Sequence, residues 1–373
     1  MPKAKYKRRK DGRFGTYVQD GYLPDGRPNR ISVYANSSAE LEKKVSEIRY
    51  EIEHGTYIAH KDVLFGDYAK QWFETYQINN QPPTKAMYQR IIDKYLKPLH
   101  NSPLINIKKS DIQRIINQNS QHRRTCEQIL LTVRQIINCA IDDGLLLRDI
   151  CRKIKLPSAT QDPENGRRSL TEIEKSAIDQ ADFTPKQRAY VAILRGCGLR
   201  PGEITALKPL DINWSENTLR VDEAITYDEN NVVWKGPKSQ SGYREISMPP
   251  FVVDALRAYL PTVDDIVLFP MERKGGPMTK SSRRKLWEGI MKKIREAAGE
   301  TVTDTGIKNQ KIFGLIQYTF RHNYCTSLYY SGVSQKEAIR LMGHSDYKLI
   351  MEVYAHLDKQ KEKTEKKLAK TSF

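Results

Sequence analysis

The spacing of apolar residues changes along the chain and divides it into three parts. In residues 1–57, short runs at 14–19 and 29–34 alternate apolar and polar side chains around an Asp-Gly pair, which is typical of a β-hairpin. A helix is predicted to follow with Ser37 or Ser38 as its N-cap, because apolar residues recur at helical spacing at Leu41, Val45, Ile48 and Ile52. We therefore expect a small sheet with one helix.

The second part, residues 62–157, has helical periodicity throughout. It predicts four helices, at 65–76, 84–95, 109–118 and 124–142. Ser110 is a credible N-cap for the third of them. This part is expected to be an all-α domain with Lys and Arg on its polar faces.

A polar segment from Pro157 to Arg168 predicts a linker, and the largest part, residues 169–357, follows it. Within that part, alternating residues predict strands at 219–225, 232–234 and 243–248. The expected fold is multidomain and mainly α: a small β-sheet-plus-helix N-terminal domain, an all-α domain, and a mixed, mostly-α domain with a small antiparallel sheet. A charged C-terminal tail is expected at residues 358–373.

The composition shows a strong excess of basic over acidic residues. The chain has 62 Lys and Arg against 45 Asp and Glu, a net charge of +17, which favours a polyanion as partner. No apolar run of about 18 residues predicts a membrane span, and the basic N-terminus lacks the apolar stretch of a secretory signal. The five cysteines form no Cys-x-x-Cys pair, so reduced, packed thiols in a cytoplasmic protein are expected and a structural zinc site is not.

Basic residues are dense at the start of the chain, and five of them are candidate DNA contacts: Lys7, Arg8, Arg9, Lys10 and Arg13. A disordered basic arm is the alternative, although such arms rarely carry alternating Tyr, Val and Ile runs. For the helical part, DNA binding and a simple packing role both stay open.

Candidate chemistry lies in the third part. A predicted helix at 186–194 runs into a Gly-rich turn, and Pro201 suits the first position of the next helix. Arg200 therefore lies beside outward-pointing backbone N–H groups, which is a natural phosphate cradle, or else it is a surface arginine in a turn. Lys238 lies between the last two predicted strands. A lysine on such a hairpin tip can serve as a mobile proton donor, although solvated turn lysines are commoner.

Further along, Tyr318 and Arg321 are three residues apart near the start of an apolar helix and share a face. Ser334 predicts the N-cap of the next helix and Gly343 its C-cap, so His344 is presented from a tight corner between helices. A tyrosine, Tyr354, follows ten residues later.

Each of these segments alone is weak evidence for a function, but their order along the chain is specific. Arg-x-x-Glu, a hairpin Lys, x-x-x-Arg-His, Gly-His and then a Tyr followed by x-His resemble the tyrosine recombinase (phage integrase) family across the whole third part. The organisation resembles the three-domain integrases of phages and conjugative transposons. The resemblance implies an arm-type DNA-binding domain at 1–57, a helical core-site-binding domain at 62–157 and a catalytic domain at 169–357.

The resemblance also implies the chemistry. Tyr354 would attack the scissile phosphate and leave a 3′-phosphotyrosyl bond with a free 5′ hydroxyl. Arg200 and Arg321 would clamp the nonbridging oxygens, so that no metal or cofactor is needed. Lys238 would protonate the leaving oxygen, and His344 would hydrogen-bond the phosphate.

Two supporting positions complete the set. Glu203 matches a residue that would orient Arg200. Tyr318 stands where the family usually has His, and a phenol with a pKa near 10 is a poor base at neutral pH. Either Tyr318 only hydrogen-bonds the site, or His344 or water takes the proton of Tyr354, so the general base is left open.

These features predict a bacterial enzyme that works on double-stranded attachment-site DNA in the cytoplasm, integrating or excising a mobile element. One tyrosine cuts one strand, so the family implies a homotetramer in the synapse, with or without an accessory DNA-bending or excision factor. The alternatives are a non-catalytic, sequence-specific DNA-binding protein on a recombinase scaffold and a type IB topoisomerase-like enzyme.

Overall fold

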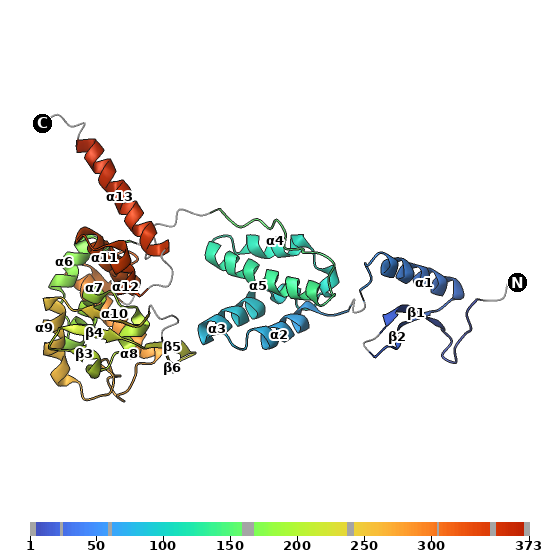
Figure 1. The fold of residues 1–373 in the computed structure, drawn as a ribbon, viewed down its shortest axis with the longest axis horizontal. Helices are drawn as coiled ribbons and strands as arrows, with labels where there is room; N and C mark the ends of the chain where they lie inside the picture. Colours follow the sequence, from blue (N-terminus) through green and yellow to red (C-terminus); the bar gives the residue numbers. More distant parts are fainter. Residues whose placement is uncertain are drawn as a thin grey trace. The chain divides into compact units, whose positions relative to one another are not determined.

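The computed structural model describes most of the chain, namely residues 5–22, 25–58, 62–158, 168–236, 242–303, 306–343 and 348–368. The chain divides into two compact units, 1–160 and 161–373, and each is described by itself (Figure 1). Within the described ranges, no helix is long and apolar enough to cross a lipid bilayer.

The first unit begins with the predicted hairpin and helix. Strand β1 (Phe14–Tyr22) pairs antiparallel with β2 (Pro28–Ala35), and helix α1 (Ser38–Glu53) follows (Figure 1). Ser37 is the N-cap, and its side chain accepts a hydrogen bond from the backbone N–H of Glu40 at 3.1 Å. Two residues predicted for the inner face of this helix, Leu41 and Val45, form a small core with Val18, Val33 and Ala35 of the strands. The other two, Ile48 and Ile52, are partly buried against it.

The remainder of this unit is helical, as predicted. Its main helices are α2 (Phe65–Tyr76), α3 (Pro82–Arg90), α4 (Lys109–Gln118) and α5 (Arg123–Asp142). Shorter helical turns are a π-helical turn (Ile91–Tyr95), which continues α3, and two 3₁₀ turns (Lys97–Leu99 and Leu104–Asn106).

The N-cap predicted for α4 is wrong by two residues. Lys108, not Ser110, is the N-cap, and Ser110 lies inside the helix. The physical reason is Asp111, whose carboxylate accepts a hydrogen bond from the backbone N–H of Lys108 at 3.0 Å and so satisfies a group at the helix start.

The second unit is a mostly helical body with small antiparallel sheets. Its helices are α6 (Glu172–Gln180), α7 (Pro185–Cys197), α8 (Pro201–Ala206), α9 (Pro250–Tyr259), α10 (Lys280–Ala297), α11 (Gln317–Tyr330), α12 (Gln335–Met342) and α13 (Lys348–Leu368), with 3₁₀ turns at Pro209–Asp211 and Leu260–Thr262. Its strands are β3 (Ile212–Asn213), β4 (Thr218–Val221), β5 (Ala224–Asp228), β6 (Asn231–Lys235), β7 (Arg244–Ser247), β8 (Thr301–Thr303) and β9 (Gly306–Lys308).

The strand pairing differs from the expected hairpin around Lys238. The first predicted strand is broken into β4 and β5, and β5 pairs with β6 while β4 pairs with β7 and β3. The connection from β6 to β7 therefore joins two different sheets, and the strands on either side of it are not partners among the described residues. Periodicity locates strands but carries no information on which strand pairs with which.

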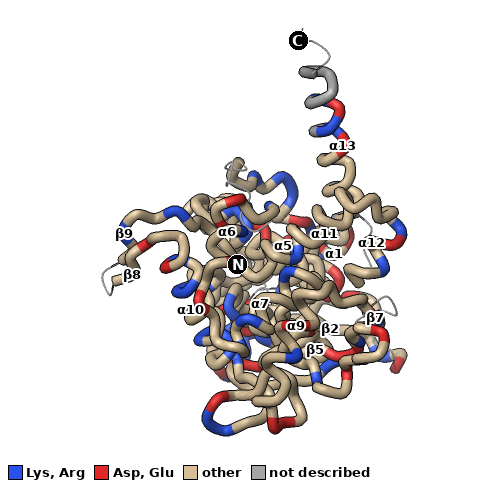
Figure 2. The backbone as a smooth tube through the Cα atoms, turned by 90° about the vertical axis from the view of Figure 1, so that its left-hand side faces the viewer, with Lys and Arg blue, Asp and Glu red and all other residues tan. Residues whose placement is uncertain are grey.

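Helix α13 also changes the picture of the C-terminus. The predicted tail begins at residue 358, yet α13 continues to Leu368 and projects from the rest of the second unit (Figure 2). Lys, Arg, Asp and Glu lie along this projecting segment (Figure 2). The described part of the predicted charged tail, residues 358–368, is thus helical.

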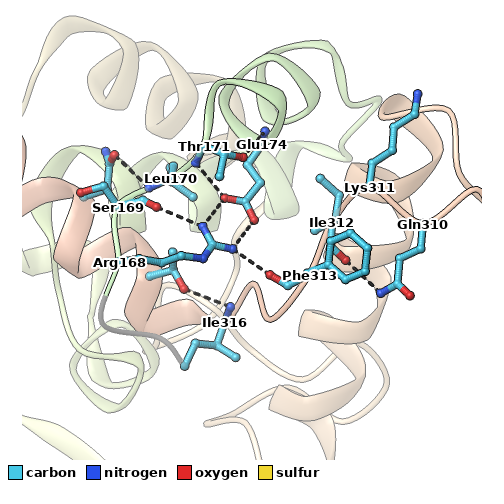
Figure 3. A network of polar contacts seen from close by, with 12 residues as sticks. Arg168, Ser169, Leu170, Thr171, Glu174, Gln310, Lys311, Ile312, Phe313 and Ile316 are labelled. Carbon is cyan, nitrogen blue, oxygen red and sulfur yellow. Dashed lines mark hydrogen bonds and ion pairs between the residues drawn. The ribbon is translucent and has the colours of Figure 1, made fainter. Parts of the chain in front are cut away.

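A buried ion pair anchors the start of the described part of this unit (Figure 3). The guanidinium of Arg168 donates to both carboxylate oxygens of Glu174 at 2.6 Å and to the carbonyl of Phe313 at 2.7 Å. The Glu174 carboxylate also accepts from the backbone N–H of Thr171 at 2.9 Å, which caps α6. Arg168 thus joins the N-terminal end of α6 to a segment far away in the sequence.

We expect Arg168→Met to destabilise the second unit by about 3 kcal/mol, because it leaves the carboxylate of Glu174, whose side chain is only 2% exposed, buried without its partner. Urea denaturation of the full chain measures this loss. The double variant Arg168→Met/Glu174→Gln removes the unpaired charge and should recover part of the loss. Equal losses in the single and double variants would contradict the ion-pair explanation.

Candidate active site

A cavity of about 490 Å³ lies on the second unit where several predicted residues meet. Its lining includes Arg200, Glu203, Arg283, Tyr318 and Gly343. The residues come from both strands of the β5–β6 hairpin and their flanking residues, from α8, from the first turns of α10 and α11, and from the end of α12. Segments separated by more than a hundred residues in the sequence therefore form one concave surface.

Arg200 is placed by the turn between α7 and α8. Helix α7 ends at Gly198, whose left-handed φ of 60° suits glycine, and a Cβ there would lie 2.2 Å from the ring of Tyr324. Arg200 then becomes the N-cap residue of α8, with Pro201 in its first turn. Its guanidinium donates to Glu203 at 2.6 Å and to the carbonyl of Gly343 at 3.0 Å.

Arg321 lies in the first part of α11 and is only 3% exposed. Its guanidinium donates to the carbonyl of Gly198 at 2.6 Å and to the carbonyl of Met342. Burial, together with the positive charge of Arg200, lowers its pKa to about 9, so Arg321 is still protonated at neutral pH. It connects the turn before Arg200 with the end of α12.

A third arginine, Arg244, belongs to the same network and was not predicted. It is the first residue of β7, and its guanidinium donates to Glu203 at 2.8 Å and to the carbonyl of Leu341 at 2.9 Å. The alternation within β7 is a signal that could have revealed it: Arg244 and Ile246 are buried, while their neighbours on the strand are exposed. A charged residue at an inward position needs a buried partner.

The three arginines meet at the C-terminal end of α12. Three successive carbonyls accept a hydrogen bond from a different guanidinium: Leu341 from Arg244, Met342 from Arg321, and Gly343 from Arg200. The last carbonyls of a helix lack partners within it and carry the negative end of the helix dipole, so cations are favoured there. The end of α12 thus gathers three positive charges beside the cavity.

Glu203 offsets part of this charge. Burial alone would raise its pKa, but the adjacent guanidinium of Arg244, followed by those of Arg321 and Arg200, lowers the pKa to about 2. The carboxylate is therefore ionised throughout the physiological range. It also accepts from the backbone N–H of Arg200 at 2.8 Å, which fixes the start of α8.

Tyr354 lies on α13 and does not reach the cavity in this structure. Its side chain is 4% exposed and packs among apolar residues of α11 and α12, including Cys325 and Met342. The hydroxyl donates to the carbonyl of Val333 at 3.2 Å, and the ring packs edge-on against Tyr329 at 5.1 Å. Burial raises the pKa of Tyr354 to about 12, so this state disfavours the phenolate.

The remaining predicted residues fall into two groups. Lys238 and His344 lie outside the described residues, although their described neighbours Gly236, Gly242 and Gly343 all line the cavity. Tyr318 does line the cavity, and its side chain is 47% exposed. The structure thus brings Arg200, Glu203 and Tyr318 together with the buried Arg321, and keeps Tyr354 apart.

The predicted DNA contacts lie in the other unit and are exposed: Lys7, Arg8, Arg9, Lys10 and Arg13. Some of them also stabilise their own turn. Arg13 pairs with Asp11 at 3.0 Å, the guanidinium of Arg8 donates to the carbonyl of Gly12 at 2.8 Å, and Arg9 stacks over the ring of Tyr34 at 5.0 Å. The basic surface is thus held by the hairpin.

The chain has recognisable relatives. Residues 170–361 match the phage integrase family, and residues 64–119 match the N-terminal SAM-like domain of phage integrases. A tyrosine recombinase XerC-like protein of Caldanaerobacter subterraneus is 25% identical over 92% of both chains. The transposase from transposon Tn916 of Enterococcus faecalis is 23% identical over 93% of this chain and 89% of its own.

Solved structures share the fold. The Tn1549 transposon integrase in complex with a circular intermediate DNA has a TM-score of 0.65 at 22% identity, covering 80% of this chain and 97% of its own. A lambda integrase dimer bound to a COC′ core site has a TM-score of 0.55 at 16% identity and covers 95% of each chain. The family match spans more than half of the chain, including every predicted catalytic residue. The protein therefore belongs to the phage integrase family.

Proposed function

We propose that this chain, a tyrosine-type site-specific recombinase, cuts and rejoins DNA by forming a covalent 3′-phosphotyrosyl link through Tyr354. The observation that carries the proposal is the pair of guanidinium groups, those of Arg200 and Arg321, which are held at the end of α12 beside one cavity. Each keeps N–H groups beyond those used in the hydrogen bonds to the protein, since a guanidinium has five.

The chemistry follows from these groups. The Tyr354 oxygen attacks the scissile phosphorus, the bond to the 5′ oxygen breaks, and the ester formed conserves the energy needed for rejoining. Arg200 and Arg321 offset the charge that develops on the nonbridging oxygens. Lys238 supplies the proton to the leaving 5′ oxygen, and His344 hydrogen-bonds the phosphate. The acceptor of the tyrosine's own proton stays open, with Tyr318 on the cavity as a hydrogen-bonding group.

Before cleavage, Tyr354 must leave the site where it is packed. Its hydroxyl has to exchange the carbonyl of Val333 for the phosphate, and its ring has to leave Tyr329. Moving α13 accomplishes both, because α13 carries Tyr354. We infer that engagement of DNA in the cavity favours this shift, which keeps the nucleophile away from phosphates until then.

The partner is double-stranded attachment-site DNA in the cytoplasm of a bacterial host, bound by domains at 1–57, 62–157 and 169–357. Exchange between two duplexes requires four protomers because each supplies one tyrosine. A lambda integrase tetramer bound to a Holliday junction, with a TM-score of 0.55 to this chain, supports that arrangement. An accessory bending or excision factor fits the same scheme.

A nicked duplex from the ends of the mobile element that carries the gene tests the proposal. Cleavage next to the nick releases a short fragment that diffuses away, so the covalent protein–DNA adduct accumulates and is seen on a denaturing gel. We expect an adduct without added metal. Binding of the duplex with no adduct under any condition would instead favour the non-catalytic DNA-binding alternative.

The N-terminal unit should contribute affinity rather than chemistry. We expect Lys7→Ala/Lys10→Ala to weaken binding to arm-site DNA and to reduce the slope of log affinity against log salt by about one for each phosphate that the lysines no longer neutralise. Adduct formation on the short nicked duplex should be unchanged. An unchanged salt dependence would remove these two lysines from the DNA-binding surface.

A further inference from the structure

Arg244 is a buried charged residue with no role in the chemistry described above. Its side chain is only 1% exposed. Arg244 lies at the start of β7, three residues after the 237–241 segment that contains Lys238. A guanidinium costs free energy to bury unless hydrogen-bonded partners surround it. Its position in the fold therefore depends on the groups it contacts.

Those contacts come from three segments of the active site. Nη2 lies 2.8 Å and Nη1 3.3 Å from the two oxygens of Glu203 on α8. Nε donates to the carbonyl of Leu341 at the end of α12, at 2.9 Å. Nη1 also donates to the carbonyl of Gly242 at 3.2 Å. Gly242 is the first residue after the 237–241 segment. One rigid, planar group thus joins all three.

Gly343 gives a second sign of close fit at this point. It ends α12 with a left-handed φ of 60°, and a Cβ added there would lie 2.7 Å from Nη1 of Arg244. The end of α12 at Gly343 therefore packs directly against the Arg244 guanidinium. A change in Arg244 would alter the support of this helix end as well as that of Glu203.

The consequence for catalysis passes through Glu203. Its two oxygens are shared between the guanidinium of Arg244 and two donors of Arg200, the backbone N–H and Nη1. Resting on the strand cleavage proposed above, we propose that Arg244 is a positioning residue for that step. It holds Glu203 and the end of α12 in the arrangement that presents Arg200 to the scissile phosphate. Arg244 itself does not contact the phosphate.

The charge on Glu203 makes the pH dependence of the cleavage rate a suitable readout, because a purely structural role of Arg244 would not change it. The charged groups that face Glu203 are Arg200 at the start of α8, Arg244 on β7 and Arg321 on α11. Burial opposes ionisation of Glu203, and Arg244 is the largest influence that favours it. Without Arg244 the pKa of Glu203 rises, and protonation at lower pH would weaken its hold on Arg200.

The test measures single-turnover adduct formation on the nicked duplex from the ends of the element, between pH 6 and pH 9. We expect Arg244→Met to be slower than the wild type by about tenfold at pH 9 and by about 100-fold at pH 6, with DNA affinity within about threefold. Adding Glu203→Gln should make the ratio to the wild type independent of pH. A ratio for Arg244→Met that does not vary with pH would overturn the proposal.

Two further variants separate positioning from stability. Arg168→Met breaks another buried Arg–Glu pair in the same unit and should lower stability while leaving the pH profile of cleavage as in the wild type. Arg244→Lys keeps a cation beside Glu203 but cannot contact all three segments, so we expect the wild-type pH profile with a rate lowered about tenfold. A wild-type rate for Arg244→Lys, or a pH effect in Arg168→Met equal to that in Arg244→Met, would contradict the assignment. If Arg244→Met does not fold, the rate and pH profile of Arg244→Lys decide the question.

Discussion

Tyr354→Phe should abolish the covalent protein–DNA adduct, lowering cleavage of a nicked attachment-site duplex by roughly 10⁴-fold or more, because phenylalanine has no hydroxyl to attack the scissile phosphorus. Folding should change little. The substitution keeps the ring that packs against Tyr329 and removes only one hydrogen bond, to the carbonyl of Val333, which contributes about 1 kcal/mol. DNA affinity should equal that of the wild type.

The matched control is Tyr329→Phe. This tyrosine lies against Tyr354, and its hydroxyl donates to Asp358, so the variant also removes one hydroxyl from the same cluster. We expect it to cleave DNA within a fewfold of the wild type. Adduct formation by Tyr354→Phe at a rate near that of the wild type would refute the assignment of the nucleophile.

Arg200→Lys should lower the cleavage rate by about 10²–10³-fold, because an ammonium group cannot make the paired hydrogen bonds of a guanidinium to two oxygens. The change keeps the positive charge beside Glu203. The side chain of Arg200 is 30% exposed, so the stability of the unit should fall by less than for a fully buried arginine. Single-turnover rates at saturating enzyme separate this effect from DNA binding.

Arg195 offers a control of equal exposure nearby. Its side chain is also 30% exposed. Arg195 lies in the last turn of α7, outside the cavity lining, and pairs with Asp179 of α6. Arg195→Lys should therefore leave the cleavage rate unchanged. Comparable losses in Arg195→Lys and Arg200→Lys would mean that the effect comes from general charge geometry rather than from contact with the phosphate.

Local elements were predictable because their signals are local. Ser37 and Ser334 are the N-caps where the sequence placed them, and Gly343 ends α12 in the left-handed conformation. The helices of the first unit follow apolar spacing, which depends only on neighbouring residues. Asp111 accounts for the one misplaced cap, because a carboxylate inside the first turn can satisfy the helix start as well as a serine before it.

The features that escaped prediction depend on partners distant in sequence. Strand alternation could not reveal that β7 pairs with β4 rather than with β6. Arg244 finds its partners on α8 and α12, and neither is near it in the chain. The packing of Tyr354 likewise depends on tertiary structure. The motif identifies the tyrosine, but its burial against α11 and α12 follows from how α13 packs on them.

The burial of Tyr354 makes Tyr318 a competing candidate for the nucleophile. Among the described residues, Tyr318 lines the cavity with Arg200, whereas Tyr354 lies in the adjoining core. A mechanism without movement of α13 would therefore place the wrong phenol next to the phosphate. The assignment of Tyr354 requires that α13 moves, and the identity of the modified residue reports on that movement.

The most direct measurement is to trap the adduct on the nicked duplex, digest the protein, and identify by mass spectrometry the residue that carries the nucleotide. We predict a phosphotyrosyl bond at Tyr354 and at no other tyrosine. A nucleotide attached to Tyr318, or to Tyr324, Tyr329, Tyr330 or Tyr347, would contradict it.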